Sequence, residues 1–287
     1  MDPPVLSVVV PTRGRAAYLE VTLDSLLDQR TETAYEIVVV DDGAPDATAA
    51  VVAARPAVRY VGHGEARGLN AARNTGLQES QAELIAFVDD DVLVPSGWVD
   101  ALVAGSRRHP EAEAFGGPIR ARFEGRTPRG CGREEPPITT LDLGPEDCEA
   151  TKAWGANFAV RRAAVERVGP FDERMVRPHG DEEEWIERLR ASGGMVVYLA
   201  EAGLDHRRWC APRCCSGRSG ARAPSCGWVG ARTGSPGSGR WRAPPTRADG
   251  RPGRATGVAS ERRRWAGSCG CWADACGTRR AGGARRA

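Results

Sequence analysis

Short apolar runs that alternate with helical segments constrain the fold of this 287-residue chain most strongly. The runs cover residues 5–10, 37–40, 58–61 and 84–88, and the segments between them carry apolar residues at helical spacing. A strand that is apolar on both faces must be covered on both faces. The alternation therefore predicts an α/β fold, with a mostly parallel sheet flanked by helices.

Polar residues follow three of these four runs. Ligands of parallel sheets bind beyond the carboxyl ends of the strands, so these residues predict a ligand crevice at that edge. Three adjacent aspartates repel one another, and a divalent cation with a polyphosphate ligand would relieve this repulsion. A solvated acidic turn is the plainer alternative. The residues in question are Pro11, Thr12 and Arg13, then Asp41 and Asp42, and finally Asp89, Asp90 and Asp91.

The pattern becomes less regular after the first 113 residues. A strand is predicted at 114–119, followed by an irregular region rich in Pro, Gly and Arg through residue 145. Order is expected again from residue 154. Helices are predicted at 162–168 and 181–191, and a final strand at 195–199.

The composition changes abruptly after Arg208. Residues 1–208 contain 24 Lys and Arg against 35 Asp and Glu, whereas residues 209–287 contain 16 against 3 and no Leu, Ile, Met, Phe or Tyr. A segment with so little to bury cannot offset its chain entropy, so we expect a disordered tail. The tail is a mixture of Arg, Gly, Ala, Pro, Ser, Cys and Trp. These are the residues that G- and C-rich codons encode when they are read in a shifted frame. Our hypothesis is that the reading frame was lost near Arg208.

A basic arm that binds nucleic acid or zinc is the alternative for this tail. Its seven cysteines show no paired Cys-x-x-Cys spacing, and we expect no nucleic-acid partner. Neither a signal peptide nor an apolar stretch of about 20 residues is visible. Two cysteines before the break fit a reducing compartment. We therefore expect a cytoplasmic protein, and peripheral contact with the inner face of the membrane stays open.

Four motifs, in order, resemble the family 2 glycosyltransferases. They are VVVPTR (8–13), VVVDDG (38–43), GLNAARNTG (68–76) and FVDDD (87–91). WGAN (154–157) and the acids at 181–182 extend the resemblance to about residue 208. The first motif has no Gly-rich phosphate loop after it, which argues against a pyrophosphorylase, a dinucleotide-binding dehydrogenase and a P-loop enzyme.

The resemblance implies a GT-A, Rossmann-like domain over residues 1–208. Its nucleotide-binding half would be 1–113 and its acceptor half 114–208, with 209–287 as the tail. The implied activity is transfer of a sugar from a nucleoside diphosphate sugar to a hydroxyl of a saccharide, lipid-linked or small-molecule acceptor, with inversion and with Mn²⁺ or Mg²⁺. A non-catalytic nucleotide-sugar-binding module is the alternative, because the C-terminus is altered.

The resemblance also assigns roles at the donor. Asp91 would be the direct metal ligand, Asp89 or Asp90 would hold the ribose, and Asp89 and His206 are further candidate ligands. Arg73 would lie at the diphosphate, because Arg makes charge-assisted bonds to phosphate. Arg67 is a second candidate for this role. The alternatives are that Asp41 and Asp42 form an ordinary turn, that the two arginines are solvated helix residues and that His206 is structural. At the base or ribose the implied residues are Pro11, Thr12, Arg13 and Asp41 or Asp42.

The catalytic base is implied in the segment 180–189. The family has Glu-Asp where this chain has Asp181-Glu182, and counting back from Arg188 aligns Glu182 with the catalytic acid. Asp181 is the alternative base. The alternative to catalysis is that both acids simply cap the N-terminus of the helix. A carboxylate within reach of an acceptor hydroxyl can remove its proton. Trp154, Gly155 and Asn157 are implied at the acceptor, and Trp154 and Trp185 would stack on a sugar or pack in the core.

Overall fold

A computed structural model describes residues 3–125, 138–175 and 181–210 of the chain. The predicted disordered tail and the frame-loss hypothesis cover residues 209–287; residues 209 and 210 end a strand, and the rest of this segment lies outside the described residues. Residues 126–137 of the predicted irregular region and the cysteines of the tail from Cys214 onward also lie outside the described residues.

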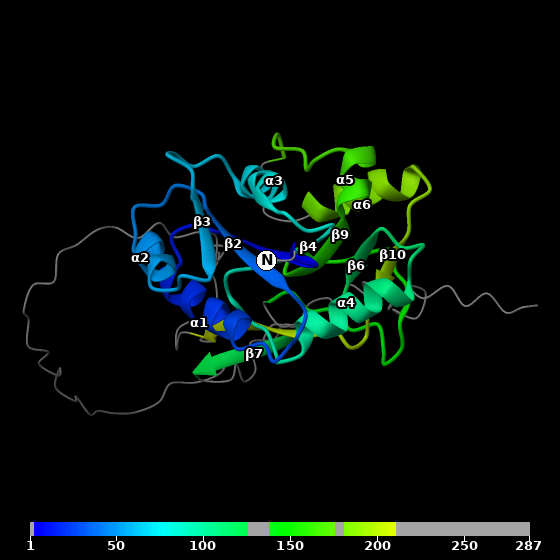
Figure 1. Ribbon diagram of the computed structural model, residues 1–287, viewed down its shortest axis with the longest axis horizontal. Helices are drawn as coiled ribbons and strands as arrows, with labels where there is room; N and C mark the ends of the chain where they lie inside the picture. Colours follow the sequence, from blue (N-terminus) through cyan, green and yellow to red (C-terminus); the bar gives the residue numbers. More distant parts are fainter. Residues whose placement is uncertain (1–2, 126–137, 176–180, 211–287) are drawn as a thin grey trace, which may run out of the picture. The chain divides into compact units, whose positions relative to one another are not determined.

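The central sheet has eight strands, in the order β3-β2-β1-β4-β9-β6-β10-β8 (Figure 1). Neighbours among the first four strands are parallel, whereas β9 is antiparallel to both β4 and β6. The sheet is thus mixed but mostly parallel in its first half, as predicted. The bounds are β1 (Leu6–Thr12), β2 (Tyr35–Asp41), β3 (Val58–Gly62), β4 (Leu84–Val88), β6 (Ala114–Gly116), β8 (Cys148–Glu149), β9 (Asn157–Arg161) and β10 (Val196–Tyr198).

Helices cover both faces of this sheet, which explains why its central strands β1 and β4 are buried throughout. All seven residues of β1 and all five of β4 are buried. In Figure 1, α3, α5 and α6 lie on one side of the sheet and α1 and α4 on the other. The bounds are α1 (Ala16–Leu27), α2 (Thr48–Ala53), α3 (Leu69–Glu79), α4 (Trp98–Arg108), α5 (Arg162–Val168) and α6 (Asp181–Ala191).

One glycine permits the close packing of α3 on the sheet. A Cβ added to Gly76 would overlap the side chain of Val9 on β1. The absence of a side chain at this position therefore lets the helix approach the strand directly.

The strand order reverses between β1 and β4. The chain runs outward from β1 through β2 to β3, and then α3 returns it to β4 on the other side of β1. A crevice forms at the carboxyl ends of two strands where the order reverses. The segment after Thr12 and the acidic turn after Val88 both lie at this point.

A second sheet was not predicted. It has three strands in the order β5-β11-β7, with β5 (Val92–Leu93), β11 (Leu204–Cys210) and β7 (Ile119–Gly125). The predicted irregular region therefore begins later than expected, because residues 119–125 form a strand. Both β7 and β11 mix charged with apolar residues, so only their mutual pairing, from Leu204↔Ile119 to Cys210↔Gly125, identifies them as strands.

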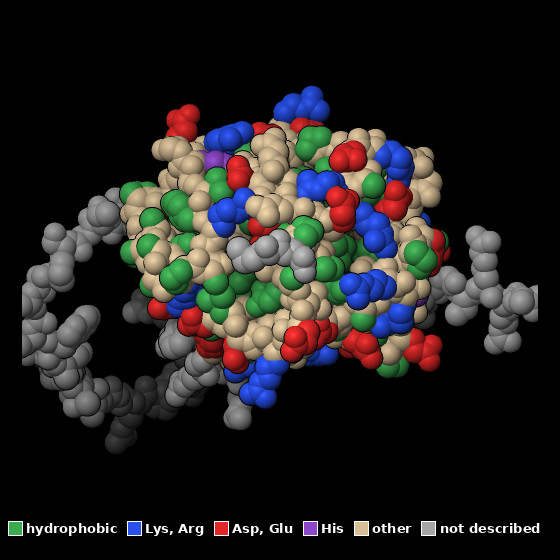
Figure 2. Space-filling view, in the orientation of Figure 1, with side chains coloured by type: hydrophobic (Ala, Val, Ile, Leu, Met, Phe, Trp, Pro, Cys, Tyr) green, Lys and Arg blue, Asp and Glu red, His purple; other side chains and the backbone are tan. Residues whose placement is uncertain are grey.

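The surface of the described part mixes charges of both signs. On the face shown in Figure 2, acidic and basic side chains are interspersed around apolar and neutral ones. Within residues 3–125, 138–175 and 181–210, no helix has the length and apolar character that a bilayer crossing requires.

Candidate active site

The acidic turn after β4 divides its three carboxylates between two directions. Asp90 points into the protein, where Thr12 Oγ1 donates a 2.7 Å hydrogen bond to Oδ2 and Arg15 Nη1 lies 2.9 Å from Oδ1. Asp90 is only 4% exposed, and this burial raises its pKa to about 7 although Arg15 opposes the rise. Both carboxylate oxygens of Asp90 are thus bonded within the protein.

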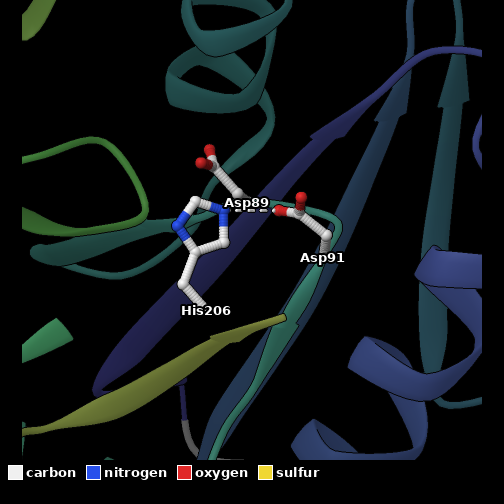
Figure 3. A group of neighbouring side chains, drawn as sticks. All are labelled: Asp89, Asp91 and His206. Atoms are coloured by element: carbon white, nitrogen blue, oxygen red, sulfur yellow. Dashed lines mark hydrogen bonds and ion pairs between the residues drawn. The ribbon is translucent and has the colours of Figure 1, made fainter. Parts of the chain in front are cut away.

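Asp89 and Asp91 lie together with His206 from β11 (Figure 3). Each of the three residues offers one ligand atom, and these atoms lie within 4.8 Å of one another. His206 Nε2 is 3.0 Å from Asp91 Oδ1, and the N–H of Arg207 donates a 2.8 Å hydrogen bond to the Asp91 carbonyl. The pairing of β11 with β5 therefore brings His206 to the acidic turn.

The charges in this group perturb one another strongly. Burial and the Asp91 carboxylate raise the pKa of Asp89, although His206 and Arg73 oppose the rise. Burial alone would raise the pKa of Asp91, but His206 and Arg15 outweigh it and lower the value. For His206, burial alone would lower the pKa, whereas Asp91 and Asp89 raise it. Such mutual shifts are typical of functional sites.

The donor set fits a hard divalent cation. Mn²⁺ and Mg²⁺ prefer carboxylate oxygen, and imidazole nitrogen is a common further ligand. Asp89 and Asp91 supply two carboxylates, and His206 supplies the imidazole. Asp89, Asp91 and His206, the residues predicted as metal ligands, therefore lie close enough together to be candidates for one site.

Arg73 and Glu182 form a second charged pair next to this group. Arg73 lies on α3 and Glu182 is the second residue of α6, and Nη1 of Arg73 is 3.5 Å from Oε2 of Glu182. The N–H of Gly155 donates a 2.9 Å hydrogen bond to Oε1 of Glu182. The charges of both residues act on Asp89, so the pair borders the group formed by Asp89, Asp91 and His206.

Gly155 leaves the space that Arg73 occupies. A Cβ at this position would overlap the guanidinium, which is part of a side chain only 4% exposed. Arg73 also lies over the ring of Phe171, at 5.5 Å from its centroid. Of the residues implied at the acceptor, Gly155 thus acts through its backbone N–H and its lack of a side chain.

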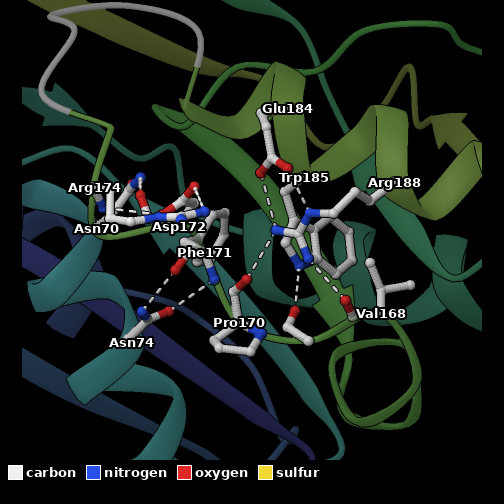
Figure 4. Close-up of polar contacts among 11 residues, drawn as sticks. Asn70, Asn74, Val168, Pro170, Phe171, Asp172, Arg174, Glu184, Trp185 and Arg188 are labelled. Atoms are coloured by element: carbon white, nitrogen blue, oxygen red, sulfur yellow. Dashed lines mark hydrogen bonds and ion pairs between the residues drawn. The ribbon is translucent and has the colours of Figure 1, made fainter.

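The loop 169–175 that carries Phe171 is fixed from two sides (Figure 4). From α3, Asn74 exchanges two 2.9 Å hydrogen bonds with the backbone of Phe171. From α6, Arg188 donates to the carbonyls of Val168 and Pro170 and pairs with Glu184. The loop therefore holds the aromatic face against which Arg73 rests.

The two acids that follow β2 have different environments. Asp42 accepts hydrogen bonds from the N–H groups of Arg67 and Gly68 at 2.7 and 3.0 Å, and His63 Nδ1 is 2.9 Å away. Asp42 thus closes the loop before α3, and Arg67 contributes its backbone there. Asp41 accepts a 2.9 Å hydrogen bond from the hydroxyl of Tyr60. Asp41 is the acid of this pair with fewer internal partners.

The aromatic and amide side chains predicted at the acceptor also differ in their environments. The Asn157 amide donates to the carbonyls of Pro118 and Ala202, and its oxygen accepts from Trp98, so it is engaged inside the core. Trp185 is fully buried and donates to the Gly169 carbonyl, which makes it a core residue. Trp154 is half-buried, with Lys152 over its ring.

The remaining predicted residues are found at the expected edge. Pro11 and Thr12 end β1 and are buried, and Arg13 is exposed in the loop that follows. Asp181 begins α6, but its side chain lies outside the described residues.

Sequence reasoning missed two residues of this site. Arg15 was overlooked because it follows the motif that ends at Arg13, although an unassigned cation near three acids was a usable signal. Phe171 was overlooked because nothing in its local sequence connects it with α3. Its contact with Arg73 arises only from the folding of a loop 98 positions away in the numbering.

Comparisons with known proteins show the family of the chain. A family model described as Glycosyl transferase family 2 matches residues 7–169, which is more than half of the chain. The chain is 31% identical over 212 residues to the pre-mycofactocin glycosyltransferase of Mycobacterium tuberculosis, covering 70% of this chain and 43% of that protein. It is 31% identical over 233 residues to the validoxylamine A glucosyltransferase of Streptomyces hygroscopicus subsp. jinggangensis, covering 70% and 55%.

A solved structure shares the fold. The mannosyltransferase PcManGT from Pyrobaculum calidifontis, in complex with GDP-Man and Mn²⁺, aligns with a TM-score of 0.54 and 21% identity over 71% of this chain and 57% of that one. This likeness confirms the predicted GT-A type of α/β fold. The chain spans about half the length of the curated relatives it matches.

Proposed function

The chain belongs to glycosyl transferase family 2, as its motifs predict, and we propose that it transfers a sugar from a nucleoside diphosphate sugar to an acceptor hydroxyl. One observation carries the proposal. A carboxylate–imidazole group (Asp89, Asp91 and His206) and an arginine–carboxylate pair (Arg73 and Glu182) meet at the carboxyl ends of β1 and β4. A diphosphate and a reacting sugar need these two kinds of group side by side.

In this proposal the donor lies along the carboxyl edge of the sheet. Asp41 accepts a hydrogen bond from the base or the ribose, beside the exposed loop that contains Arg13. Asp89, Asp91 and His206 hold Mn²⁺ or Mg²⁺. When bound, this cation supplies positive charge that offsets the charge growing on the departing nucleoside diphosphate. Arg73 adds a fixed positive charge on the same side.

Glu182 is the proposed base. Gly155 N–H and Arg73 set the orientation of its carboxylate, which lies at the first turn of α6. A carboxylate held in this way can take the proton of an acceptor hydroxyl while the hydroxyl oxygen attacks the anomeric carbon. One displacement inverts the configuration at that carbon. Trp154, half-buried next to Gly155, offers a face for the acceptor.

The test is a panel of nucleotide sugars that includes GDP-Man, the ligand of the structural relative PcManGT. Release of nucleoside diphosphate is measured with Mn²⁺, with Mg²⁺ and with EDTA, beside calorimetric binding of the same compounds. The proposal expects at least one donor to be bound and consumed, and only with a divalent cation. Binding without turnover would instead support a nucleotide-sugar-binding module, and the absence of both would contradict the proposal.

A further inference from the structure

Among the described residues, Arg15 pairs with two of the three turn aspartates, yet the proposed mechanism gives it no role. It lies in the loop after β1, and its guanidinium spans Asp90 Oδ1, at 2.9 Å, and Asp91 Oδ2. A planar guanidinium can bond two carboxylates at once, which an ammonium cannot do as well. Arg15 therefore links the inward-pointing carboxylate of Asp90 to the carboxylate of Asp91, which lies beside Asp89 and His206.

The position of Arg15 is itself fixed. Its guanidinium carbon lies 4.9 Å from the centroid of the Tyr18 ring, and the ring also faces Arg207 at 5.6 Å. Its partner Asp90 is held by Thr12, and Thr22 Oγ1 donates a 2.8 Å hydrogen bond to the Asp90 carbonyl. The side chain is only 39% exposed. Arg15 is thus part of the packed turn, in contrast to a mobile surface arginine.

The two oxygens of Asp91 consequently differ. Oδ2 is covered by Arg15, whereas Oδ1 faces His206 Nε2 at 3.0 Å. A carboxylate with one covered oxygen can offer only the other to a cation. Mg²⁺ demands octahedral geometry with single oxygens at short distance, whereas Ca²⁺ takes more ligands and often takes both oxygens of a carboxylate.

We propose that Arg15 is a positioning residue that restricts Asp91 to one ligand oxygen and thereby favours Mn²⁺ or Mg²⁺ over Ca²⁺. The inference rests on the proposed function, because it assumes that a cation binds at Asp89, Asp91 and His206. Residues that hydrogen-bond a metal-ligating carboxylate commonly change metal affinity by about 10- to 100-fold when they are replaced. We expect the ratio of the Mn²⁺ and Ca²⁺ affinities to fall about tenfold in Arg15→Ala.

The experiment measures cations alone, without a nucleotide and without turnover. Mn²⁺ is titrated into the full chain while free Mn²⁺ is followed by electron paramagnetic resonance, and Ca²⁺ is then added as the competitor. The ratio of the two affinities cancels the general effect of removing a positive charge, because both cations are divalent. Arg122→Ala is the matched control, since Arg122 pairs with Asp205 next to His206 but is 52% exposed and does not touch the group.

Arg15→Lys keeps the test open if Arg15→Ala does not fold. Its ammonium can neutralise the turn but cannot span Asp90 and Asp91, so the ratio should fall in the same direction by about threefold. An unchanged ratio in the folded variants would overturn the inference alone. The inference would also fail if Arg15→Ala weakened nucleoside diphosphate binding while the ratio stayed unchanged, since Arg15 would then act on the donor. Failure of the wild-type chain to bind Mn²⁺ would instead contradict the metal site of the proposed function.

Discussion

Asp91 and His206 lie 115 positions apart in the sequence, yet Oδ1 of one is 3.0 Å from Nε2 of the other. The contact exists because β11 pairs with β5, the short strand that directly follows the acidic turn. The second sheet therefore completes a group that the first sheet only begins. Its strands are the part of the fold that local sequence patterns did not reveal.

Replacement of His206 should weaken cation binding. In His206→Ala the proposed cation loses one of three protein ligands, and we expect the affinity for Mn²⁺ to fall by at least about tenfold. The measurement is a Mn²⁺ titration of the folded variant. His109→Ala is the control, because His109 contacts Asp147 and Glu111 at the surface. Equal losses in the two variants would argue against a ligand role for His206.

Glu182→Gln should separate binding from chemistry. The amide keeps the shape of the side chain but cannot act as the base, so we expect turnover to fall by about 10²- to 10⁴-fold while donor affinity changes little. Glu183→Gln, at the half-buried neighbouring position that pairs with Lys152, is the control and should stay near wild type. Near-native turnover of Glu182→Gln would mean that Asp181 or another acid is the base.

Gly155→Ala should displace Arg73. The added methyl group would overlap the guanidinium, which cannot move freely because it is buried against Phe171. We expect a loss of about 1–3 kcal/mol in the free energy of unfolding, together with reduced turnover. Urea unfolding provides the measurement. Gly64→Ala is the control, because a Cβ there would meet no atom within 4 Å, and a similar loss in both variants would contradict the packing argument.

Asp147 should stabilise the fold in a manner that depends on pH. Burial alone would raise its pKa, but hydrogen bonds from Arg108, the Ala200 N–H and His109 outweigh burial and lower the pKa below the ordinary 3.8. The stabilisation is therefore complete above pH 3.8 and is lost as the pH falls through the lower native value.

Asp147→Asn tests this dependence. We expect it to lower the free energy of unfolding by about 1 kcal/mol at neutral pH, since the partner arginine is largely exposed. In urea unfolding the difference from wild type should stay constant between pH 7 and 5 and shrink toward pH 3. A difference that grows toward low pH would contradict the assigned partners.

Much of the fold of the first 113 residues could be predicted from sequence because its signals are local. The buried run at 84–88 and the three acids after it lie next to each other in the chain, and β4 has these bounds. The matching runs at β1 and β2 made the parallel sheet and its polar edge predictable as well. Consecutive residues of one type are what periodicity and motif spacing detect.

The different contacts of neighbouring acids could not be predicted in the same way. Asp89, Asp90 and Asp91 are identical in type, and only the positions of Thr12 and Arg15 decide that Asp90 points inward. Likewise Asp42 closes a loop because His63 and two backbone N–H groups from later residues converge on it. These choices depend on contacts between distant segments, which one sequence does not display.

The measurement that tests the central claim most directly is calorimetric binding of UDP, GDP, ADP and dTDP to the full chain and to Asp91→Ala, with and without Mn²⁺. The account predicts that the wild-type chain binds at least one of them only with Mn²⁺, and that Asp91→Ala, still folded, has lost this binding. Binding by Asp91→Ala as tight as that of the wild type, or wild-type binding unaffected by removal of the cation, would contradict it.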